Sequence, residues 1–376
     1  MRKHFIDNLR WLVVILLIPY HAAQAFNTWG EANYVFFYPD KVLSSLIVFL
    51  SPFIMPLMFM LAGMSTKYSL EKRSVGQYLL ERLKRLVVPL IFGTLAFCPV
   101  MSYIGDKLNL GYEGSFFAHY GIFFTRWTNL TGYDGGFNVG QFWFLLYLFI
   151  ISLLAAGVLA VMKKAVKKPH NAVDIPFPVI CLFVIPLPLF FDLLSVAGKS
   201  FADYIYVFFI GYFVMTNEKT LEKTEKYRYV TLAAGLAACS LSVYMFIWSG
   251  RDFGILNVIA KAFGEWFMIL ALTGIGKHSL DRKGKISEYM SSRSFPYFSI
   301  HFIWTVLFQY WSSHLPGGGV LTLFVLPVIA AFVATLACSE ICIRIPLLCF
   351  LMGTKPAAPS LSADNRRDGT DQILKP

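Results

Sequence analysis

Long apolar stretches recur along the whole 376-residue chain, and they constrain its fold more than any other feature. A helix needs about 20 mainly apolar residues to cross the hydrocarbon core of a bilayer. Charged residues make up only 15% of the sequence and hydrophobic residues 57%, which is far from the balance of a soluble domain. We therefore predict an all-α, polytopic integral membrane bundle with about ten transmembrane helices. The expected spans are 9–26, 42–64, 86–105, 140–162, 174–196, 203–216, 229–248, 254–276, 295–313 and 320–343.

The distribution of basic residues predicts the topology of this bundle. If the N-terminus is cytoplasmic, most of the 33 lysine and arginine residues fall in the inner loops and the C-terminal tail. Such an excess on the cytoplasmic side is the usual pattern of membrane proteins, so both termini are expected in the cytoplasm and the protein in a plasma or inner membrane. The net charge of +11 is then a signal of topology, and no nucleic-acid partner is expected. The expected outer loops hold Lys41, Lys107, Arg126, Lys199 and Arg251.

The sequence predicts one membrane domain over residues 1–350, followed by a tail. Residues 351–376 combine Pro, Ser, Asp and charged residues, which favours a disordered cytoplasmic tail. The aromatic-rich outer loop 106–139 is expected to cover the outer surface, either as an aromatic belt or as a carbohydrate platform. Segment 67–85 alternates apolar and charged residues and predicts an interfacial helix, for which anchoring to anionic lipid is the simplest role. The first apolar stretch lacks the features of a cleavable signal peptide and should remain as a helix.

No motif in the sequence indicates a metal or a tightly bound cofactor. The six cysteines lie in or at the ends of apolar segments, without the spacing of a metal site. A glycine-rich phosphate loop and a carboxylate cluster are also absent from the sequence.

Ionisable residues within the predicted spans are costly, so by default they mark a site or a satisfied pair. Two pairs, Lys261 with Glu265 and Glu340 with Arg344, are four residues apart on a helix and can bond directly. Two aspartates flank an outer turn, where we expect water to solvate them and assign them no role. The whole set is Arg10, His21, Asp192, Asp203, Lys261, Glu265, His301 and Glu340.

Arg10 and His21 form the most specific combination. Eleven residues make about three helical turns, so the two side chains share one face of the first helix, about 16 Å apart along its axis. Pro19 removes a backbone donor and is expected to kink the helix beside the histidine. A histidine in a membrane is often only a polar group satisfied across helices. Its alternative role is that of a general base at neutral pH.

Several segments resemble, in order, the motifs of the acyltransferase-3 family of integral membrane O-acyltransferases. Arg10 and His21 match its R-x10-H signature, and the further matches lie in the second, third, fourth and ninth spans. These are 55–63 (MPLMFMLAG), 82–85 (RLKR) with Pro89 after it, 142–145 (FWFL), and 299–301 (SIH).

The resemblance implies transfer of an acyl group, acetyl or succinyl, from cytoplasmic acyl-coenzyme A to a hydroxyl of a cell-surface or periplasmic carbohydrate. Acyl-coenzyme A is then a co-substrate and no cofactor is required. In this hypothesis His21 is the general base and an arginine group binds the phosphates of the donor. That group is Arg10, Arg82 and Arg85, and His301, Lys261 and Glu265 are candidates for a polar cavity.

The fourth-span motif departs from the family pattern. Many members continue it with a serine and a glutamate, whereas this chain continues with Leu146, Tyr147 and Leu148. In this respect the chain is closer to the branch that adds succinyl groups to periplasmic glucans. A second function stays open from the residues alone: the same buried charges suit a carrier or exporter of a small anion or a lipid-linked sugar. The sequence carries no signal for the oligomeric state.

Overall fold

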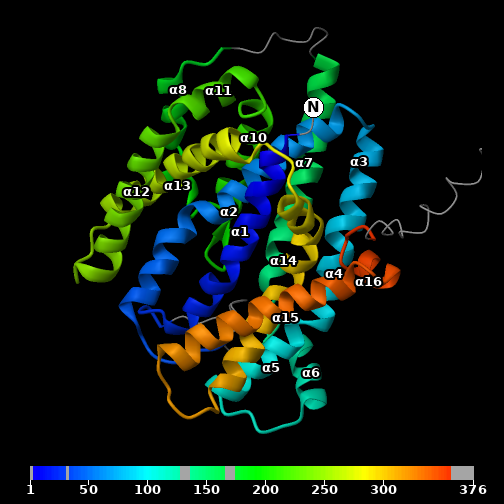
Figure 1. The fold of residues 1–376 in the computed structure, drawn as a ribbon, viewed down its shortest axis with the longest axis vertical. Coiled ribbons are helices and arrows are strands. Elements are labelled where there is room, and N and C mark those ends of the chain that lie inside the picture. The colour runs from blue at the N-terminus through cyan, green and yellow to red at the C-terminus, as the bar shows by residue number, and fades with distance from the viewer. Residues whose placement is uncertain (1–2, 31–33, 128–135, 166–173, 357–376) are drawn as a thin grey trace, which may run out of the picture.

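The protein is a helical bundle in the computed structural model, which describes residues 3–30, 34–127, 136–165 and 174–356 (Figure 1). Its α-helices are α1 (His4–Ala23), α2 (Lys41–Leu70), α3 (Val75–Arg82), α4 (Val88–Ala96), α5 (Cys98–Asn109), α6 (Phe116–Thr125), α7 (Trp143–Ala165), α8 (Phe177–Cys181), α9 (Leu187–Phe190), α10 (Phe201–Phe213), α11 (Glu218–Lys226), α12 (Arg228–Val243), α13 (Ile255–Ile275), α14 (Lys285–Ser312), α15 (Leu326–Cys342) and α16 (Pro346–Leu351).

Short 3-10 and π segments extend several of these helices. The 3-10 segments are η1 (Gln24–Phe26), η3 (Gly140–Phe142) and η4 (Leu182–Val184), and the π segments are η2 (Leu83–Val87), η5 (Tyr244–Trp248), η6 (Gly276–Leu280) and η7 (Leu321–Val325). The two strands of the described residues, β1 (Ser195–Val196) and β2 (Lys199–Ser200), pair antiparallel. Ala197 and Gly198 between them both have positive φ, which is the geometry of a tight hairpin turn.

Seven helical segments of the described chain are long and apolar enough to cross a bilayer, so the predicted all-α membrane fold is confirmed. The segments 177–190 and 201–213 are apolar but shorter. The predicted span 295–313 lies in α14, where buried Ser299, His301 and Gln309 interrupt the apolar run. The count of ten spans and the cytoplasmic location of the termini stay predictions. The seven long segments are His4–Phe26, Lys41–Leu70, Val75–Asn109, Gly140–Met162, Arg228–Trp248, Ile255–Leu280 and Leu321–Cys342.

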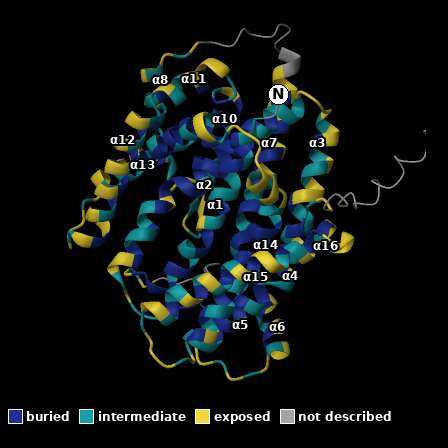
Figure 2. Cartoon of the chain, viewed as in Figure 1, coloured by how far each residue is buried: buried dark blue, intermediate teal, exposed yellow. Residues whose placement is uncertain are grey.

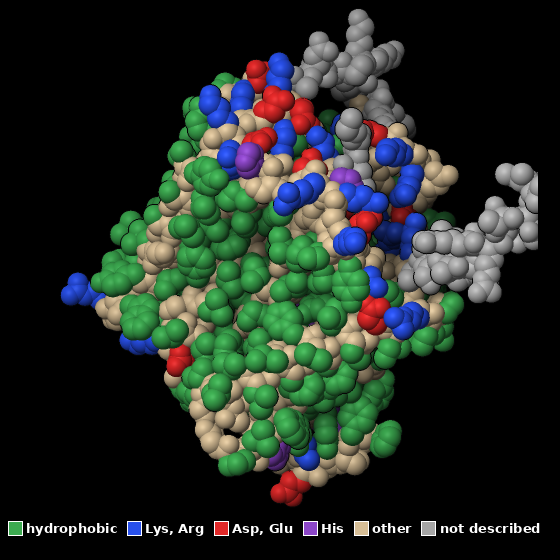
Figure 3. All heavy atoms as spheres, viewed as in Figure 1, with side chains coloured by type: hydrophobic (Ala, Val, Ile, Leu, Met, Phe, Trp, Pro, Cys, Tyr) green, Lys and Arg blue, Asp and Glu red, His purple; other side chains and the backbone are tan. Residues whose placement is uncertain are grey.

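The charged residues are confined mainly to one end of the bundle. In Figure 3 lysine and arginine side chains gather where the N-terminus lies, over α3 and α11, and hydrophobic side chains cover most of the remaining visible face. The helices differ strongly in how far they are buried. Within the most apolar stretch of each helix, 72% is buried in α2, but only 22% in the segment made by η7 and α15. Figure 2 shows the same contrast between the central α1, α2 and α14 and the outer helices. The helix α2 is therefore central, and α15 presents its side chains outward.

Two segments outside the predicted spans are only partly tested. Within the outer loop 106–139, α6 is joined to α5 because buried His119 Nε2 lies 2.6 Å from Asp106 Oδ2, and Arg126 also bonds Asp106. Residues 128–135 of that loop lie outside the described residues. The predicted tail is described only as far as Pro356, so residues 357–376 lie outside as well.

Close helix packing depends on two glycines between α2 and α10. A Cβ on Gly63 would lie 2.0 Å from the Phe208 carbonyl oxygen, and a Cβ on Gly211 would lie 2.1 Å from the Met60 carbonyl oxygen. Each helix thus meets the backbone of the other at a residue without a side chain. Small residues at such interfaces are a common means of helix association in membranes.

We predict that Gly211→Val lowers the thermal stability of the detergent-solubilised protein, because the two helices must separate to admit the side chain. Overpacking of this kind costs about 1–3 kcal/mol. Gly157→Ala is the matched control, since no atom lies within 4 Å of a Cβ at that helical position. A melting temperature for Gly211→Val equal to that of Gly157→Ala would contradict this account of the packing.

Candidate active site

A large cavity lies where α1, α2, α3 and α14 meet at the charged end of the bundle. Its volume is about 880 Å³. We call it the inner cavity. Its described lining includes six basic side chains and two carboxylates, so it carries an excess of positive charge. The basic residues are Arg10, Arg73, Arg82, Arg85, Arg293 and Lys355, and the acidic ones are Asp7 and Glu81.

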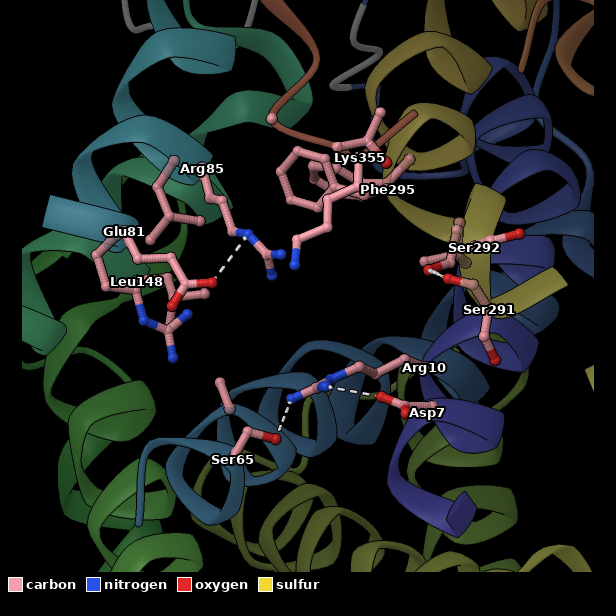
Figure 4. A pocket seen from close by; sticks show the side chains of 18 of the residues that line it. Asp7, Arg10, Ser65, Glu81, Arg85, Leu148, Ser291, Ser292, Phe295 and Lys355 are labelled. Atoms are coloured by element: carbon pink, nitrogen blue, oxygen red, sulfur yellow. Dashed lines mark hydrogen bonds and ion pairs between the residues drawn. The ribbon is translucent and has the colours of Figure 1, made fainter. Parts of the chain in front are cut away.

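Arg10 is oriented into the inner cavity by α2. Its Nη2 donates to the Leu61 carbonyl oxygen at 2.9 Å and to Ser65 Oγ at 2.6 Å, and its Nη1 lies 3.3 Å from Asp7 Oδ1 (Figure 4). Pro residues at 52 and 56 precede this part of α2. The Leu61 carbonyl and the Ser65 hydroxyl carry no charge, so Asp7 is the one charged group among these three partners. The guanidinium can therefore still bind an anion.

Arg82 and Arg85 reach the same cavity from the junction of α3 with the π segment η2. Arg82 Nη2 donates to Thr66 Oγ1 at 3.0 Å, and its guanidinium lies 5.0 Å from the centre of the Tyr78 ring. Arg85 Nε lies 3.4 Å from Glu81 Oε1 (Figure 4). Pro89 cannot donate the helical bond to the Arg85 carbonyl, and π segments often arise where such a bond is interrupted. The arginine group predicted from the sequence is therefore brought together in one cavity.

The C-terminal segment forms another wall of the inner cavity. Gly353 passes so close to the π segment that a Cβ there would lie 2.7 Å from the Arg85 carbonyl oxygen, and its φ of +62° favours glycine. This approach places Lys355 among the lining residues, beside the arginines (Figure 4). No local pattern in the sequence predicts this return of the chain.

A second, smaller cavity of about 270 Å³ contains His21 and not the arginine group. We call it the histidine cavity. Its lining combines aromatic rings with polar and charged groups from α1, α2, α10 and α13. The lining residues used below are His21, Lys199, Asp203, Lys261, Glu265 and Phe298.

His21 is held between aromatic rings. Phe302 stacks on it with ring centroids 4.0 Å apart, and the His301 ring lies beside it at 5.3 Å. His301 is fully buried, and its Nδ1 lies 2.7 Å from the Phe298 carbonyl oxygen. His301 is not one of the residues that line the histidine cavity, so it supports His21 from behind.

The charged groups of the histidine cavity pair differently from the prediction. Glu265 and Asp203 are both buried and both line this cavity, where their carboxyl groups interact with each other. Lys261 places its ammonium group 4.2 Å from the centre of the Phe191 ring, and in the described part of the chain it forms no ion pair with Glu265. The expectation that water solvates Asp203 was wrong, because α10 packs against α2 and buries this side chain; Asp192 is exposed as expected. The predicted bond between Arg344 and Glu340 is confirmed at 3.4 Å.

Lys199 also faces this cavity, and sequence reasoning placed it only in an outer loop. The hairpin of β1 and β2 turns it inward, where its Nζ donates to the Ala197 carbonyl oxygen at 2.9 Å. Burial lowers the pKa of Lys199 to about 8, because removal from water disfavours the charged ammonium. No local pattern in the sequence predicts that a loop lysine folds back in this way.

The two cavities share one lining residue, Phe298. Its ring packs edge-on against Phe144, which lines the inner cavity, with centroids 5.6 Å apart. Arg10 lines the inner cavity and His21 the histidine cavity, so the two ends of the predicted signature lie on opposite sides of this aromatic wall.

Comparison with known proteins identifies the family of the chain. A family model described as an acyltransferase domain matches residues 3–344. The chain belongs to the acyltransferase-3 family. It is therefore an O-acyltransferase, and the family match includes Arg10 and His21 on α1 and His301 on α14, whereas Lys355 of the inner cavity lies beyond the match.

The chain is also similar over most of its length to curated relatives. It is 21% identical to the glucans biosynthesis protein C of Salmonella typhi, of Salmonella choleraesuis strain SC-B67 and of Salmonella enteritidis strain P125109. The alignments cover 94% of this chain and 95% of each relative. No solved structure matches the chain significantly.

We predict that Glu265→Gln keeps the melting temperature near that of the wild type, because an amide can still bond the Asp203 carboxylate. Glu265→Leu leaves that buried carboxylate without its partner and should lower stability by about 1–3 kcal/mol. Asp192→Asn, at an exposed position, is the control. Thermal unfolding in detergent measures all three, and equal stability of Glu265→Leu and wild type would refute the pairing.

Proposed function

We propose that the protein transfers an acyl group, acetyl or succinyl, from cytoplasmic acyl-coenzyme A to a hydroxyl of a cell-surface or periplasmic carbohydrate. The bundle then lies in the plasma or inner membrane with ten spans and both termini in the cytoplasm. The observation that carries the proposal is the division of Arg10 and His21 between two cavities that meet at Phe298. Such a division suits a donor and an acceptor that arrive from opposite sides.

The charge of the inner cavity supports coenzyme A as the donor. The cavity is lined by six basic residues and only two carboxylates, so its charge is positive. Guanidinium groups bind phosphate by paired, charge-assisted hydrogen bonds. In the proposed complex Arg10, Arg82 and Arg85 bind the phosphates, and the long thioester arm points past Phe298. The inner cavity is several times larger than the histidine cavity, which agrees with a large donor and a small reacting group.

The relatives support a carbohydrate acceptor, because they are named for the biosynthesis of glucans. In the proposed reaction His21 takes the proton of an acceptor hydroxyl while its oxygen attacks the thioester carbonyl carbon. The carbon–sulfur bond breaks, an ester forms, and the coenzyme A thiolate leaves and takes up the proton from His21. Positioned bases of this kind contribute about 10²–10⁴-fold to a rate.

We predict that His21→Ala lowers kcat for acyl transfer by about 10²–10⁴-fold. The KM for acyl-coenzyme A should change little, because the phosphates bind in the other cavity. Release of coenzyme A by purified protein, offered acetyl and succinyl donors with a glucan acceptor, measures both constants. Size-exclusion elution checks the fold, and a correctly folded His21→Ala protein with normal kcat would exclude His21 as the base.

We predict that Arg85→Gln raises the KM for acyl-coenzyme A by about 10-fold, equivalent to about 1.4 kcal/mol of lost binding. Lys84→Gln removes the same charge from a neighbouring exposed residue that does not line the inner cavity, so it controls for general electrostatics. The same assay applies. An equal change in KM for both variants would show that only the overall charge of this end matters.

A further inference from the structure

His301 has a buried ring nitrogen without a partner among the described residues, on a ring that lies beside His21. His301 Nδ1 lies 2.7 Å from the Phe298 carbonyl oxygen, which can only accept a hydrogen bond, so Nδ1 carries the hydrogen. In a neutral imidazole the other nitrogen, Nε2, is then an acceptor. This Nε2 is buried and has no partner in the described part of the protein. A backbone carbonyl thus fixes the tautomer of His301.

His21 also has a ring nitrogen without a hydrogen-bond partner in the described chain. Its Nδ1 is also buried and without a partner among the described residues. The two rings are neighbours, with centroids 5.3 Å apart and planes tilted by 36°. Phe302 packs on both, stacked at 4.0 Å on His21 and at 6.2 Å from His301, and so holds both ring planes.

The helices around the pair restrict its motion. Gln309 Nε2 donates to the Ala22 carbonyl oxygen at 2.9 Å, which ties α14 to α1 one residue beyond His21. Thr305 Oγ1 donates to the His301 carbonyl oxygen at 2.9 Å. With the helices held in this way, rotation of the rings is the movement that can bring the two nitrogens together.

We propose that His301 is a positioning residue that holds His21 in its reactive tautomer. His301 Nε2 accepts a hydrogen bond from His21 Nδ1–H, and His21 Nε2 is then the bare nitrogen that takes the proton of the acceptor hydroxyl. These hydrogen bonds form a chain that begins at the Phe298 carbonyl, passes through the two imidazoles and ends in the histidine cavity. The carbonyl sets the direction of donation along the chain. This inference rests on the proposed function of His21 as the base, and it assigns His301 no contact with substrate.

The arrangement also explains why a second histidine, and not an apolar residue, lies behind the base. Once His21 is protonated, its imidazolium shares a cavity with the basic side chains of Lys199 and Lys261. A hydrogen bond to His301 Nε2 disperses the new positive charge away from the lysines. A phenylalanine at this position would fill the space and offer no acceptor.

The direct test is nitrogen-15 NMR of the protein labelled at histidine. The His21 signals are identified by their loss in His21→Ala. We expect wild-type His21 to carry its hydrogen on Nδ1, and His301→Phe to shift it to Nε2 or to a mixture of tautomers. Wild-type His21 with its hydrogen on Nε2 would overturn the proposal without any variant at position 301.

Kinetics provide the second readout. His301→Phe should lower kcat by about 100-fold, within the range of base catalysis, and leave the KM for acyl-coenzyme A unchanged. His301→Gln retains an acceptor oxygen and should recover kcat to within about 10-fold of wild type. A merely structural role of His301 predicts the reverse order, because phenylalanine fills the buried space better than glutamine.

The outcomes separate the two proposals. If His21→Ala stays fully active, the proposed function fails, whatever the tautomer of His21. If His21→Ala is inactive and His301→Phe keeps both the wild-type kcat and the wild-type tautomer, only the role of His301 fails. Should His301→Phe not fold, His301→Asn replaces it, because its shorter side chain does not reach His21.

Discussion

The pairing of α1 with α14 is the constraint on which both cavities depend. Near one end, Asn8 Nδ2 donates to the Leu280 carbonyl oxygen at 2.6 Å, and Ser287 bonds Asn8 Oδ1. Near the other end, Gln309 ties α14 to the Ala22 carbonyl. Hydrogen bonds of this kind are costly to lose in an apolar bundle, since water cannot replace the missing partner. These contacts at both ends fix how α1 and α14 lie against each other. Between them, α1 carries Arg10 and His21, and α14 carries Phe298 of the aromatic wall.

The aromatic wall explains how one helix serves two chemically different spaces. The inner cavity must attract a highly charged donor, whereas the histidine cavity must hold an imidazole between aromatic rings and a few polar groups. Phe298 separates them with its ring and, through its backbone carbonyl, also orients His301. One residue of α14 therefore contributes to both the barrier and the reactive centre. Pro296, two residues earlier, removes a backbone donor and loosens the helix at this point.

Much of the membrane fold was predictable, because apolar length and the distribution of charge are local properties of the sequence. The grouping of Arg10 with Arg82 and Arg85 also followed from the ordered motifs. The inward folding of Asp203 and Lys199 was not predictable, since it depends on a two-stranded hairpin and on the tertiary contact of α10 with α2. The same holds for Lys355, which reaches the inner cavity only because Gly353 packs against η2. Spacing along one helix placed Lys261 near Glu265, but it did not show that Asp203 competes for the same carboxyl group.

The central claim is that the donor and the base occupy separate cavities that meet at Phe298. An experimental structure of the protein with a non-hydrolysable acyl-coenzyme A analogue tests this claim most directly. Our account predicts phosphate groups beside Arg10, Arg82 and Arg85, and an acyl carbonyl that passes Phe298 to lie next to His21. An analogue bound with its phosphates outside the inner cavity, or with its acyl group remote from His21, would contradict it.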